Sequence, residues 1–395
     1  MTAISPHLRP RDGGAQPTTP VELFFDLVYV LAVTQLSHLV IDSDVSLVSL
    51  GRAAFLLMVV WWAWIYTTWM VNWFDPGSGA VRLVLVGVSL ASLLMSAAIP
   101  DAFGGDSILF ASAYVAMQVG RNIAGVRLLE SDHVLRRTFE RIVVWSLASG
   151  AFWLAGGLVA HSVRPALWGV ALVIDLTAPL VGYWTPRLGR SQTNDWAVEG
   201  GHFAERFQAF IIIALGESIV VTGATASARG LTTEIVLALT VAFLGSGALW
   251  WLYFGEVAER SRRHLAESED PGRLARDAYT YLHLPIVAGI IMVAVADDLL
   301  IAHPTSTLSA AGIVMTVGGP ALYLAGESLF RLRMIGSVNP QRILSVTALA
   351  VLGGVGTQVP ALALSGAVAL VLIALSLWEY QPLRARLRPR AQPSD

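Results

Sequence analysis

The sequence predicts an all-α integral membrane protein of about twelve transmembrane helices, formed by two parallel six-helix repeats with both termini in the cytoplasm. The prediction rests on the apolar composition, the lengths of the apolar stretches and the distribution of arginine. Of the 395 residues, 55% are hydrophobic and 14% are charged, and the mean hydropathy is +0.63. Soluble domains contain about 25% charged residues, so this composition is typical of a chain embedded in a bilayer.

The composition also excludes several chemistries. All 26 basic residues are arginine, which excludes a lysine Schiff base and the lysine of a phosphate-binding loop. Cysteine is absent, so disulfides, thiolate nucleophiles and cysteine-ligated metals are excluded as well. The histidines show no metal-ligand spacing such as HExxH. A net charge of −2 does not indicate the basic surface that binds nucleic acid. We therefore expect no metal, no cofactor and no nucleic-acid partner.

Twelve stretches are long and apolar enough to cross a hydrocarbon core of about 30 Å, which takes about 20 residues. Most of them are bounded by glycine, proline, aspartate or arginine, the usual residues at helix ends. The predicted spans are 21–41, 48–72, 81–99, 107–129, 140–160, 165–184, 203–224, 233–255, 277–301, 309–330, 340–358 and 360–378.

The placement of arginine predicts the orientation of these spans in the membrane. With twelve spans, 22 of the 26 arginines fall on the side of the N-terminus. The opposite side receives Arg52, Arg164 and Arg229, and Arg121 lies within a span. Because positive residues concentrate in cytoplasmic loops, both termini are predicted to be cytoplasmic.

The two halves of the chain resemble each other. Short motifs recur in the same order: Trp61-Trp62 and Trp250-Trp251, Tyr114 with Gln118 and Tyr323 with Glu327, Arg141 and Arg342, Pro165 and Pro360. Six spans are an even number, so a duplicated six-helix unit has parallel topology. We accordingly divide the chain into a disordered cytoplasmic N-terminus (1–20), a first repeat (21–184), a cytoplasmic linker (185–202), a second repeat (203–380) and a basic cytoplasmic tail (381–395).

Ionisable residues within the spans are the candidate functional groups. A charge at the bilayer centre costs about 2.5–3.5 kcal/mol on insertion scales, so such a residue is expected to face a partner or a cavity. Glu22 and Asp26 lie four residues apart on one helix face, as do Thr34 and His38. Two carboxylates one turn apart repel, so we expect one to carry a proton or to have a cationic partner. For Glu22, the alternative interpretation is that its side chain lies at the membrane surface and contacts cytoplasmic water.

Arg121 is the one arginine deep within a span, and its expected partner is Asp26, Asp175 or Glu217. The alternative is a static ion pair that joins two helices. The candidate ion or substrate pathway comprises Glu22, Asp26, Gln35, His38, Arg121, Asp175, Glu205, Arg206, Glu217 and His283. A candidate aromatic pocket comprises Tyr29, Trp62, Trp64 and Trp251, with ordinary helix packing as the alternative for these rings.

Several blocks together resemble the bacterial low temperature requirement protein A (LtrA) family. They are Glu22–His38, Tyr66–Trp69, Glu205–Phe207, Ala214–Ser218, Leu249–Phe254 and Tyr281–Pro285. The resemblance implies a multi-pass protein of the bacterial inner membrane, linked to growth at low temperature. A second likeness covers one helix: Phe24, Asp26 and Tyr29 resemble an element of the lysosomal-type potassium and proton channels, from which Pro20 and Gln208 depart.

Two functions follow as hypotheses. The first is a transporter or channel in which protonation of a buried carboxylate changes the state of a carboxylate–arginine cluster. The alternative is an intramembrane enzyme acting on a lipid or isoprenoid, with Asp26, Asp175 or Glu217 as general acid and aromatic rings stabilising a cation. In both, the partners are membrane lipid and a small ion or lipid-like substrate, and formation of a homo-oligomer is left open.

Overall fold

The computed structural model describes residues 6–10, 16–41, 46–130, 133–196, 198–255, 261, 263–265 and 267–387, and in these ranges its regular elements are all helices. Each of the twelve predicted spans overlaps a helix or a run of consecutive helical segments, although the sixth, 165–184, is helical only as far as Thr177. The helices are α1 (Pro20–Ile41), α2 (Leu47–Trp73), α3 (Gly79–Ala97), α4 (Ser107–Leu128), α5 (Val134–Leu158), α6 (Arg164–Thr177), α7 (Gly200–Arg229), α8 (Thr233–Phe254), α10 (Pro271–Leu274), α11 (His283–Ala302), α12 (Ala310–Ile313), α13 (Gly319–Ile335), α14 (Pro340–Val355) and α15 (Ala361–Leu387).

Two short π-helices interrupt this series. The segment η3 (Ala275–Tyr281) joins α10 to α11, and η4 (Val314–Gly318) joins α12 to α13. Single-turn 3₁₀ segments occur at η1 (Ile99–Asp101), η2 (Thr193–Asp195) and η5 (Gly356–Gln358).

Nine helical runs within the described residues are long and apolar enough to cross a membrane. The other three fall short for separate reasons. At a rise of 1.5 Å per residue, the 14 residues of α6 and the 16 of α14 are shorter than a full crossing. The 22-residue α4 is long enough but carries Gln118, Arg121 and Asn122 in its interior. The chain is therefore a multi-helix membrane protein, and the count of twelve spans stays a prediction.

Local sequence signals set several helix ends. A capping box between Ser46 and Ser49 starts α2. Asn339 caps the first turn of α14 by accepting a hydrogen bond from the Gln341 backbone N–H. The helix α13 ends at Gly336, whose φ of 66° lies in the left-handed region that favours glycine.

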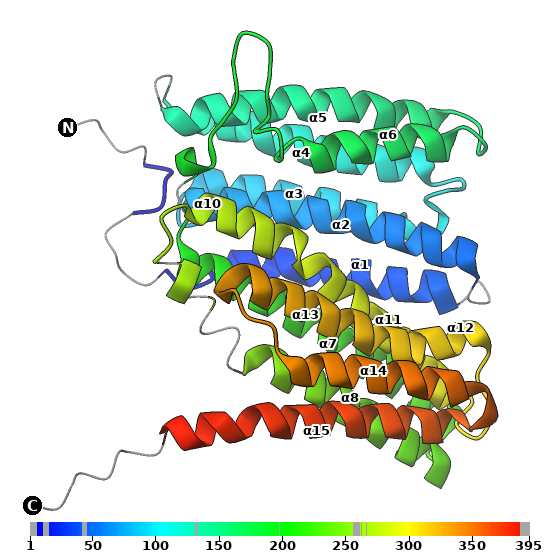
Figure 1. The fold of residues 1–395 in the computed structure, drawn as a ribbon. Helices are drawn as coiled ribbons and strands as arrows, with labels where there is room; N and C mark the ends of the chain where they lie inside the picture. Colours follow the sequence, from blue (N-terminus) through cyan, green and yellow to red (C-terminus); the bar gives the residue numbers. More distant parts are fainter. Residues whose placement is uncertain are drawn as a thin grey trace, which may run out of the picture. The chain divides into compact units, whose positions relative to one another are not determined.

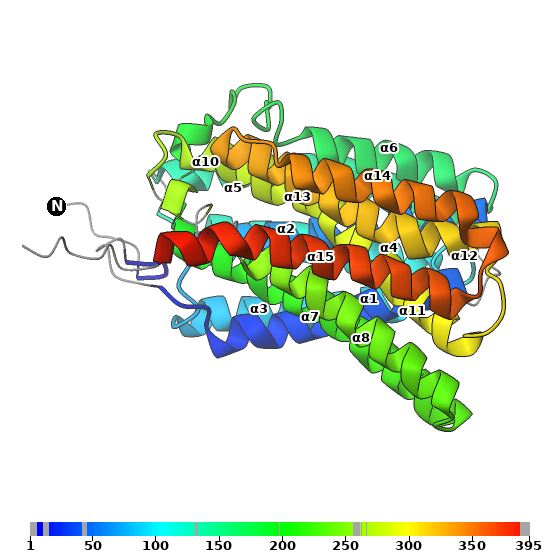
Figure 2. The ribbon, with the colours of Figure 1, turned by 60° about the horizontal axis from the view of Figure 1, so that its bottom comes forward.

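The chain divides into two compact units. The first unit holds residues 1–213 and 265–281, and the second holds 214–264 and 282–395. In the first, α1 packs against α2 and α3, and α4 packs against α3 and α5, with α6 against α5 (Figure 1). In the second, α11 packs against α13, and α15 packs against α14 and α8 (Figure 2).

This division differs from the predicted domain boundary. The sequence places the boundary in the linker 185–202, whereas the boundary between the two units falls within α7, between Ile213 and Ala214. The segment 265–281, which contains α10 and η3, groups with the first unit although the sequence assigns it to the second repeat. One helix, α7, thus belongs to both units, and the internal repeat stays a prediction.

The predicted disordered N-terminus contains an ordered segment. Within 6–10, the Leu8 backbone pairs with Phe74, and the Arg9 N–H donates to the carbonyl of Trp73. Arg9 is buried because its side chain reaches an acidic partner described below. The remainder of this predicted segment at 1–5 and 11–15, and residues 388–395 of the predicted tail, lie outside the described residues.

Close packing of α11 against α13 depends on Gly289. A Cβ atom at this position would lie 2.6 Å from the Tyr323 backbone nitrogen and 2.7 Å from the Gly319 carbonyl oxygen. Both neighbours are backbone atoms, which cannot move without shifting the helix, so only glycine permits this approach.

We expect Gly289→Ala to lower the free energy of unfolding by about 1–3 kcal/mol, the usual cost of overpacking. Titration with SDS in mixed micelles, followed by circular dichroism, measures the change. Gly247→Ala in α8 is the matched control, because nothing lies within 4 Å of its added Cβ. Equal unfolding curves for the two variants would contradict the close contact.

Candidate functional site

A fully buried ion pair joins α1 to α7 in the first unit. The guanidinium of Arg206 donates two hydrogen bonds to Asp26, with Nη1–Oδ2 at 2.5 Å and Nη2–Oδ1 at 2.7 Å. The indole N–H of Trp64 donates a third, 2.8 Å from Asp26 Oδ1. Asp26 and Arg206 are both 0% exposed. Such a two-pronged pair is among the stronger charge-assisted contacts in proteins.

Aromatic rings surround this pair. The Arg206 guanidinium lies 5.8 Å from the Trp64 ring centre, and the Trp64 ring packs at 5.1 Å from Phe207 and 4.5 Å from Phe210. Rings keep water away, so the attraction between Asp26 and Arg206 acts through a medium of low dielectric.

A second buried ionic contact lies one turn earlier along both helices. Glu22 accepts hydrogen bonds from Arg9 at 3.1 Å and contacts His202 Nε2 at 2.6 Å. The backbone N–H and the hydroxyl of Thr19 also donate to Glu22, each at 2.7 Å. On the other edge of the imidazole, His202 Nδ1 lies 3.1 Å from the side-chain amide of Asn72. A His202 tautomer with the proton on Nε2 satisfies both contacts.

The two contacts form a ladder between α1 and α7. Glu22 and Asp26 are four residues apart, and so are His202 and Arg206, so each helix presents two groups on one face. The two carboxylates that repel each other along α1 thus each have their own partner on α7. We call Glu22, Asp26, His202 and Arg206 the α1–α7 ladder. The matching spacing is a signal from which His202 could have been found in the sequence.

The structure corrects the expected partner of Arg121. Within the described part of the chain, no carboxylate lies within salt-bridge distance of its guanidinium. It donates instead to Gln118 and, at 3.0 Å, to the Thr67 hydroxyl, and it lies 5.2 Å from the Tyr66 ring centre. Its Nε is buried and has no acceptor among the described residues. The correction arises because Asp26 is already occupied by Arg206.

A chain of neutral side chains links Arg121 to Asp175. The Gln118 amide that accepts from Arg121 donates in turn to the Tyr114 hydroxyl at 3.0 Å. Tyr114 donates to Asp175 Oδ2 at 2.9 Å, and Trp153 donates to the same oxygen at 3.0 Å. Arg121 and Asp175 are therefore connected across two intervening side chains and do not touch.

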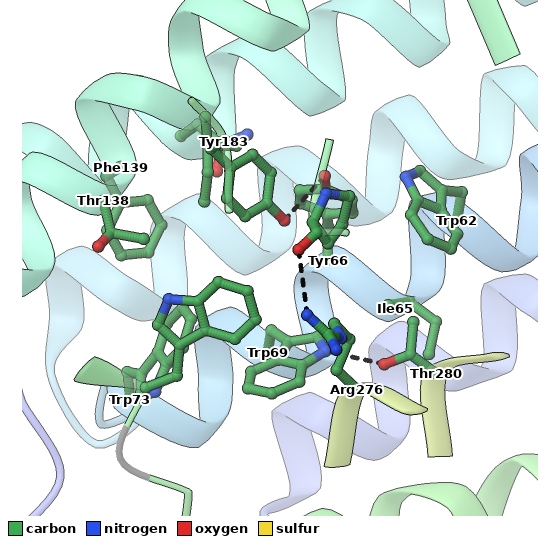
Figure 3. A pocket seen from close by; sticks show the side chains of 14 residues that line it. Trp62, Ile65, Tyr66, Trp69, Trp73, Thr138, Phe139, Tyr183, Arg276 and Thr280 are labelled. Carbon is green, nitrogen blue, oxygen red and sulfur yellow. Dashed lines mark hydrogen bonds between the residues drawn. The ribbon is translucent and has the colours of Figure 1, made fainter. Parts of the chain in front are cut away.

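An aromatic cavity lies beside this chain in the first unit (Figure 3). Its volume is about 30 Å³, enough for about two water molecules. Five residues of α2 line it at the spacing of one helix face, and the remaining wall comes from α4, α5, the segment 179–196 and η3. The lining residues are Trp62, Ile65, Tyr66, Trp69, Trp73, Asn122, Thr138, Phe139, Ile142, Pro179, Tyr183, Trp196, Arg276 and Thr280.

The composition of this cavity corrects the predicted aromatic pocket. Of the four predicted rings, only Trp62 lines it. Trp64 is bound to Asp26, and the Tyr29 hydroxyl pairs with Ser92 at 3.2 Å. Trp251 lies in the second unit and is 45% exposed. The error arose because neighbours in sequence point to different faces of a helix.

The other predicted pathway residues are dispersed. Gln35 and His38 are half-buried on α1, and Glu205 is half-buried on α7, where its carboxylate accepts the Thr18 backbone N–H at 3.0 Å. Glu217 and His283 are buried in the second unit. His283 Nε2 lies 2.9 Å from the Tyr253 hydroxyl.

Sequence reasoning missed two polar groups in the second unit. Asp297 and Asp298, near the end of α11, accept hydrogen bonds from Ser218 at 2.7 Å and Thr225 at 2.6 Å. Arg342 on α14 binds both Glu327 on α13 at 2.7 Å and Glu379 on α15 at 2.8 Å. The adjacent acidic residues 297 and 298 within an apolar stretch were the available signal for the first group.

The chain matches known sequences along most of its length. Residues 17–377 match the family described as Bacterial low temperature requirement A protein (LtrA). The chain is also similar to an uncharacterized protein, RA0937, of Rhizobium meliloti (strain 1021), with 36% identity over 374 residues, which cover 94% of this chain and 90% of that protein. No solved structure matches the chain.

The ladder predicts strong coupling between Asp26 and Arg206. Arg206→Gln leaves a buried carboxylate without its cation, so we expect it to reduce the free energy of unfolding by about 3–5 kcal/mol. Adding Asp26→Asn removes the unpaired charge and should recover a large part of that loss. SDS unfolding of the single and double variants measures the coupling. The half-buried pair Arg136–Glu140, whose side chains are 30% and 33% exposed, is the control, with an expected coupling of about 0–1 kcal/mol.

The corrected position of Arg121 makes a separate prediction. Because Arg121 does not contact Asp26, Arg121→Ala and Asp26→Asn should add in their effects on unfolding free energy within about 0.5 kcal/mol. The same unfolding assay tests this. Rescue of Arg121→Ala by Asp26→Asn would contradict the observed partners.

Proposed function

The chain belongs to the bacterial low temperature requirement A (LtrA) family, and we propose that this multi-helix membrane protein is a proton-coupled transporter of the bacterial inner membrane. The observation that supports this most directly is the α1–α7 ladder, in which two carboxylates, a histidine and an arginine are fully buried between two membrane helices. Buried ionisable groups of this kind are typical of proton relays and coupling sites.

Protonation of Asp26 is the proposed switching event. A proton on this carboxylate removes the charge that holds the Arg206 guanidinium, whose Nε has no acceptor among the described residues even in the paired state. An arginine left as an isolated charge in an apolar interior is unstable, so Arg206 is driven to find another partner. Proton binding thereby favours a different position for the first half of α7.

The helix α7 can pass this change along the chain. Its residues 200–213 pack in the first unit, and 214–229 pack in the second. A hydrogen-bonded helix of 30 residues moves as a connected element, so a displacement of the helix at Arg206 is transmitted to the residues after Ile213. This continuity gives a physical route from protonation to a change of state in both units.

Complete burial favours a transporter over an open channel. Asp26 and Arg206 have no exposed surface in this state, so a proton reaches them only after the helices move. Access that depends on a conformational change is the defining feature of alternating-access transport. We link this activity to growth at low temperature, which the description of the family names.

The alternative of an intramembrane enzyme has less support. Carbocation chemistry needs an acid facing an aromatic pocket. None of the described residues that line the aromatic cavity is aspartate or glutamate, and its one ionised group is the cation of Arg276. Asp26 and Asp175 bind other partners away from that lining.

Proton flux in proteoliposomes tests the proposal. With a potassium diffusion potential set by valinomycin, we expect the wild-type protein to acidify the lumen, reported by a trapped pH-sensitive dye. Asp26→Asn should reduce the initial rate at least tenfold, because the carboxylate can no longer take up a proton. Glu140→Gln, which alters a half-buried ion pair away from the α1–α7 ladder, should leave the rate unchanged. A wild-type rate equal to that of empty liposomes, or an unaffected Asp26→Asn rate, would overturn the proposal.

A further inference from the structure

A short segment before α1 is fixed to the end of α2. Within residues 6–10, which we call the strap, the Leu8 backbone pairs with Phe74. The Arg9 backbone N–H donates to the Trp73 carbonyl at 2.9 Å. These backbone contacts give the Arg9 side chain a defined position, although the strap precedes the first helix.

The Arg9 side chain occupies the end of the α1–α7 ladder. Its Nε donates to the Val71 carbonyl at 2.6 Å, and its Nη2 lies 3.1 Å from both carboxylate oxygens of Glu22. Glu22 and His202 lie in the first turns of α1 and α7, and the other ladder pair lies one turn further along. Arg9 is 6% exposed, against 0% for Glu22 and 1% for His202, so the strap stands between this end of the ladder and the surface.

One carboxylate serves two basic groups at this end. His202 Nε2 lies 2.6 Å from Glu22 and 3.0 Å from Arg9 Nη2. While the imidazole is neutral, the charges of Arg9 and Glu22 balance, as do those of Asp26 and Arg206 on the next turn. A second proton on His202 makes the imidazole a cation and gives this buried set an excess positive charge. Because an unpaired charge is costly in an apolar interior, the imidazolium and Arg9 then compete for Glu22.

The atom that takes this proton is His202 Nδ1, because Nε2 already donates to Glu22. Nδ1 lies 3.1 Å from the side-chain Nδ2 of Asn72. The Glu199 backbone fixes the orientation of that amide: Asn72 Nδ2 donates to the Glu199 carbonyl, and Asn72 Oδ1 accepts the Glu199 N–H, each at 2.9 Å. Asn72 therefore presents a donor to Nδ1, which carries no proton in the observed state. Protonation of Nδ1 sets two donors against each other.

The other ionisable groups at this end are held by separate contacts. The half-buried carboxylate of Glu199 accepts backbone N–H groups at the start of α7, and that of Glu205 accepts the Thr18 N–H at 3.0 Å. On the strap itself, His7 Nδ1 lies 2.7 Å from the Ser78 hydroxyl. Among the described residues, therefore, Glu22 is the anion for which the two cations compete.

We propose that the strap closes this end of the α1–α7 ladder and that protonation of His202 at Nδ1, by a proton from solvent, releases it. The imidazolium replaces the Arg9 guanidinium as the cation of Glu22, and Arg9 moves with the strap into water. Release uncovers Glu22, one turn from Asp26. The release depends only on contacts within the first unit. Its consequence, that acid opens the path by which Asp26 takes up a proton, rests on the proposed function.

Electron paramagnetic resonance of a nitroxide at Pro10→Cys tests the release in the full-length protein purified in detergent. The chain contains no cysteine, so one introduced thiol is labelled alone, and Pro10 is exposed on the strap. We expect the mobile fraction of the spectrum to rise at least about threefold from about pH 8 to about pH 5, the range in which histidine titrates. A label at Ser162→Cys, which is exposed before α6, should show no change.

Variants of the strap and the ladder identify the groups responsible. His202→Gln keeps a donor for Glu22 and cannot become charged, so the strap should stay immobile throughout. Glu22→Gln removes the anion and Arg9→Gln removes the anchoring cation, so either should make the strap mobile already at the higher pH. Glu22→Gln decides the matter if His202→Gln does not fold. The matched controls are His7→Gln and Arg82→Gln, which change the imidazole of the strap and an exposed arginine of α3, and both should behave as the wild type does.

The outcomes separate the strap from the transport proposal. A mobile fraction that does not change with pH, or that rises equally in His202→Gln, would overturn the release. A pH-dependent strap without proton flux in proteoliposomes would support the release and overturn the transporter. Where flux is present, Arg9→Gln should raise its initial rate at about pH 8 at least about threefold, because the path is no longer closed. An unchanged rate would overturn the closing role of the strap.

Discussion

The cost of an unpaired charge in an apolar interior governs the arrangement of the first unit. Asp26 and Glu22 lie in a helix that belongs in a membrane, and neither is accessible to water. Each is stable there because a cationic or imidazole group from α7 approaches it closely, with Arg9 completing the set around Glu22. The need for these partners fixes the register of α1 against α7 and draws the segment 6–10 into the protein.

The buried tryptophans of this unit fall into two groups. At the α1–α7 ladder, the indole of Trp64 donates to Asp26, and its ring shields the ion pair from water. The indole N–H groups of Trp62 and Trp196 are buried and have no hydrogen-bond partner among the described residues. These residues come from the same apolar composition, and they differ only in whether an acceptor lies opposite.

Arg121 differs from the other buried cations. Arg206 in the first unit and Arg342 in the second each contact carboxylates directly, whereas Arg121 reaches Asp175 only through Gln118 and Tyr114. Such a relay of neutral groups holds the two charges apart and leaves the field of Arg121 partly uncompensated near the cavity.

The sequence by itself determined the membrane character, the positions of the helices and the set of ionisable residues within them. Apolar runs of about 20 residues admit few alternatives in a bilayer, so each of the twelve predicted ranges overlaps a helix. Family membership likewise followed from short blocks such as Glu22–His38 and was confirmed by the match over 17–377.

Only the tertiary structure decided which groups meet. Helical periodicity says which residues share a face and gives no information on which helix that face opposes. For this reason the sequence left the partner of Arg121 open, gathered Trp64 and Trp251 into one pocket, and omitted Arg9, His202 and Arg276. The boundary between the two units within α7 could not be predicted from the sequence either. Long-range packing determines this boundary, and the local sequence of a continuous apolar helix does not indicate it.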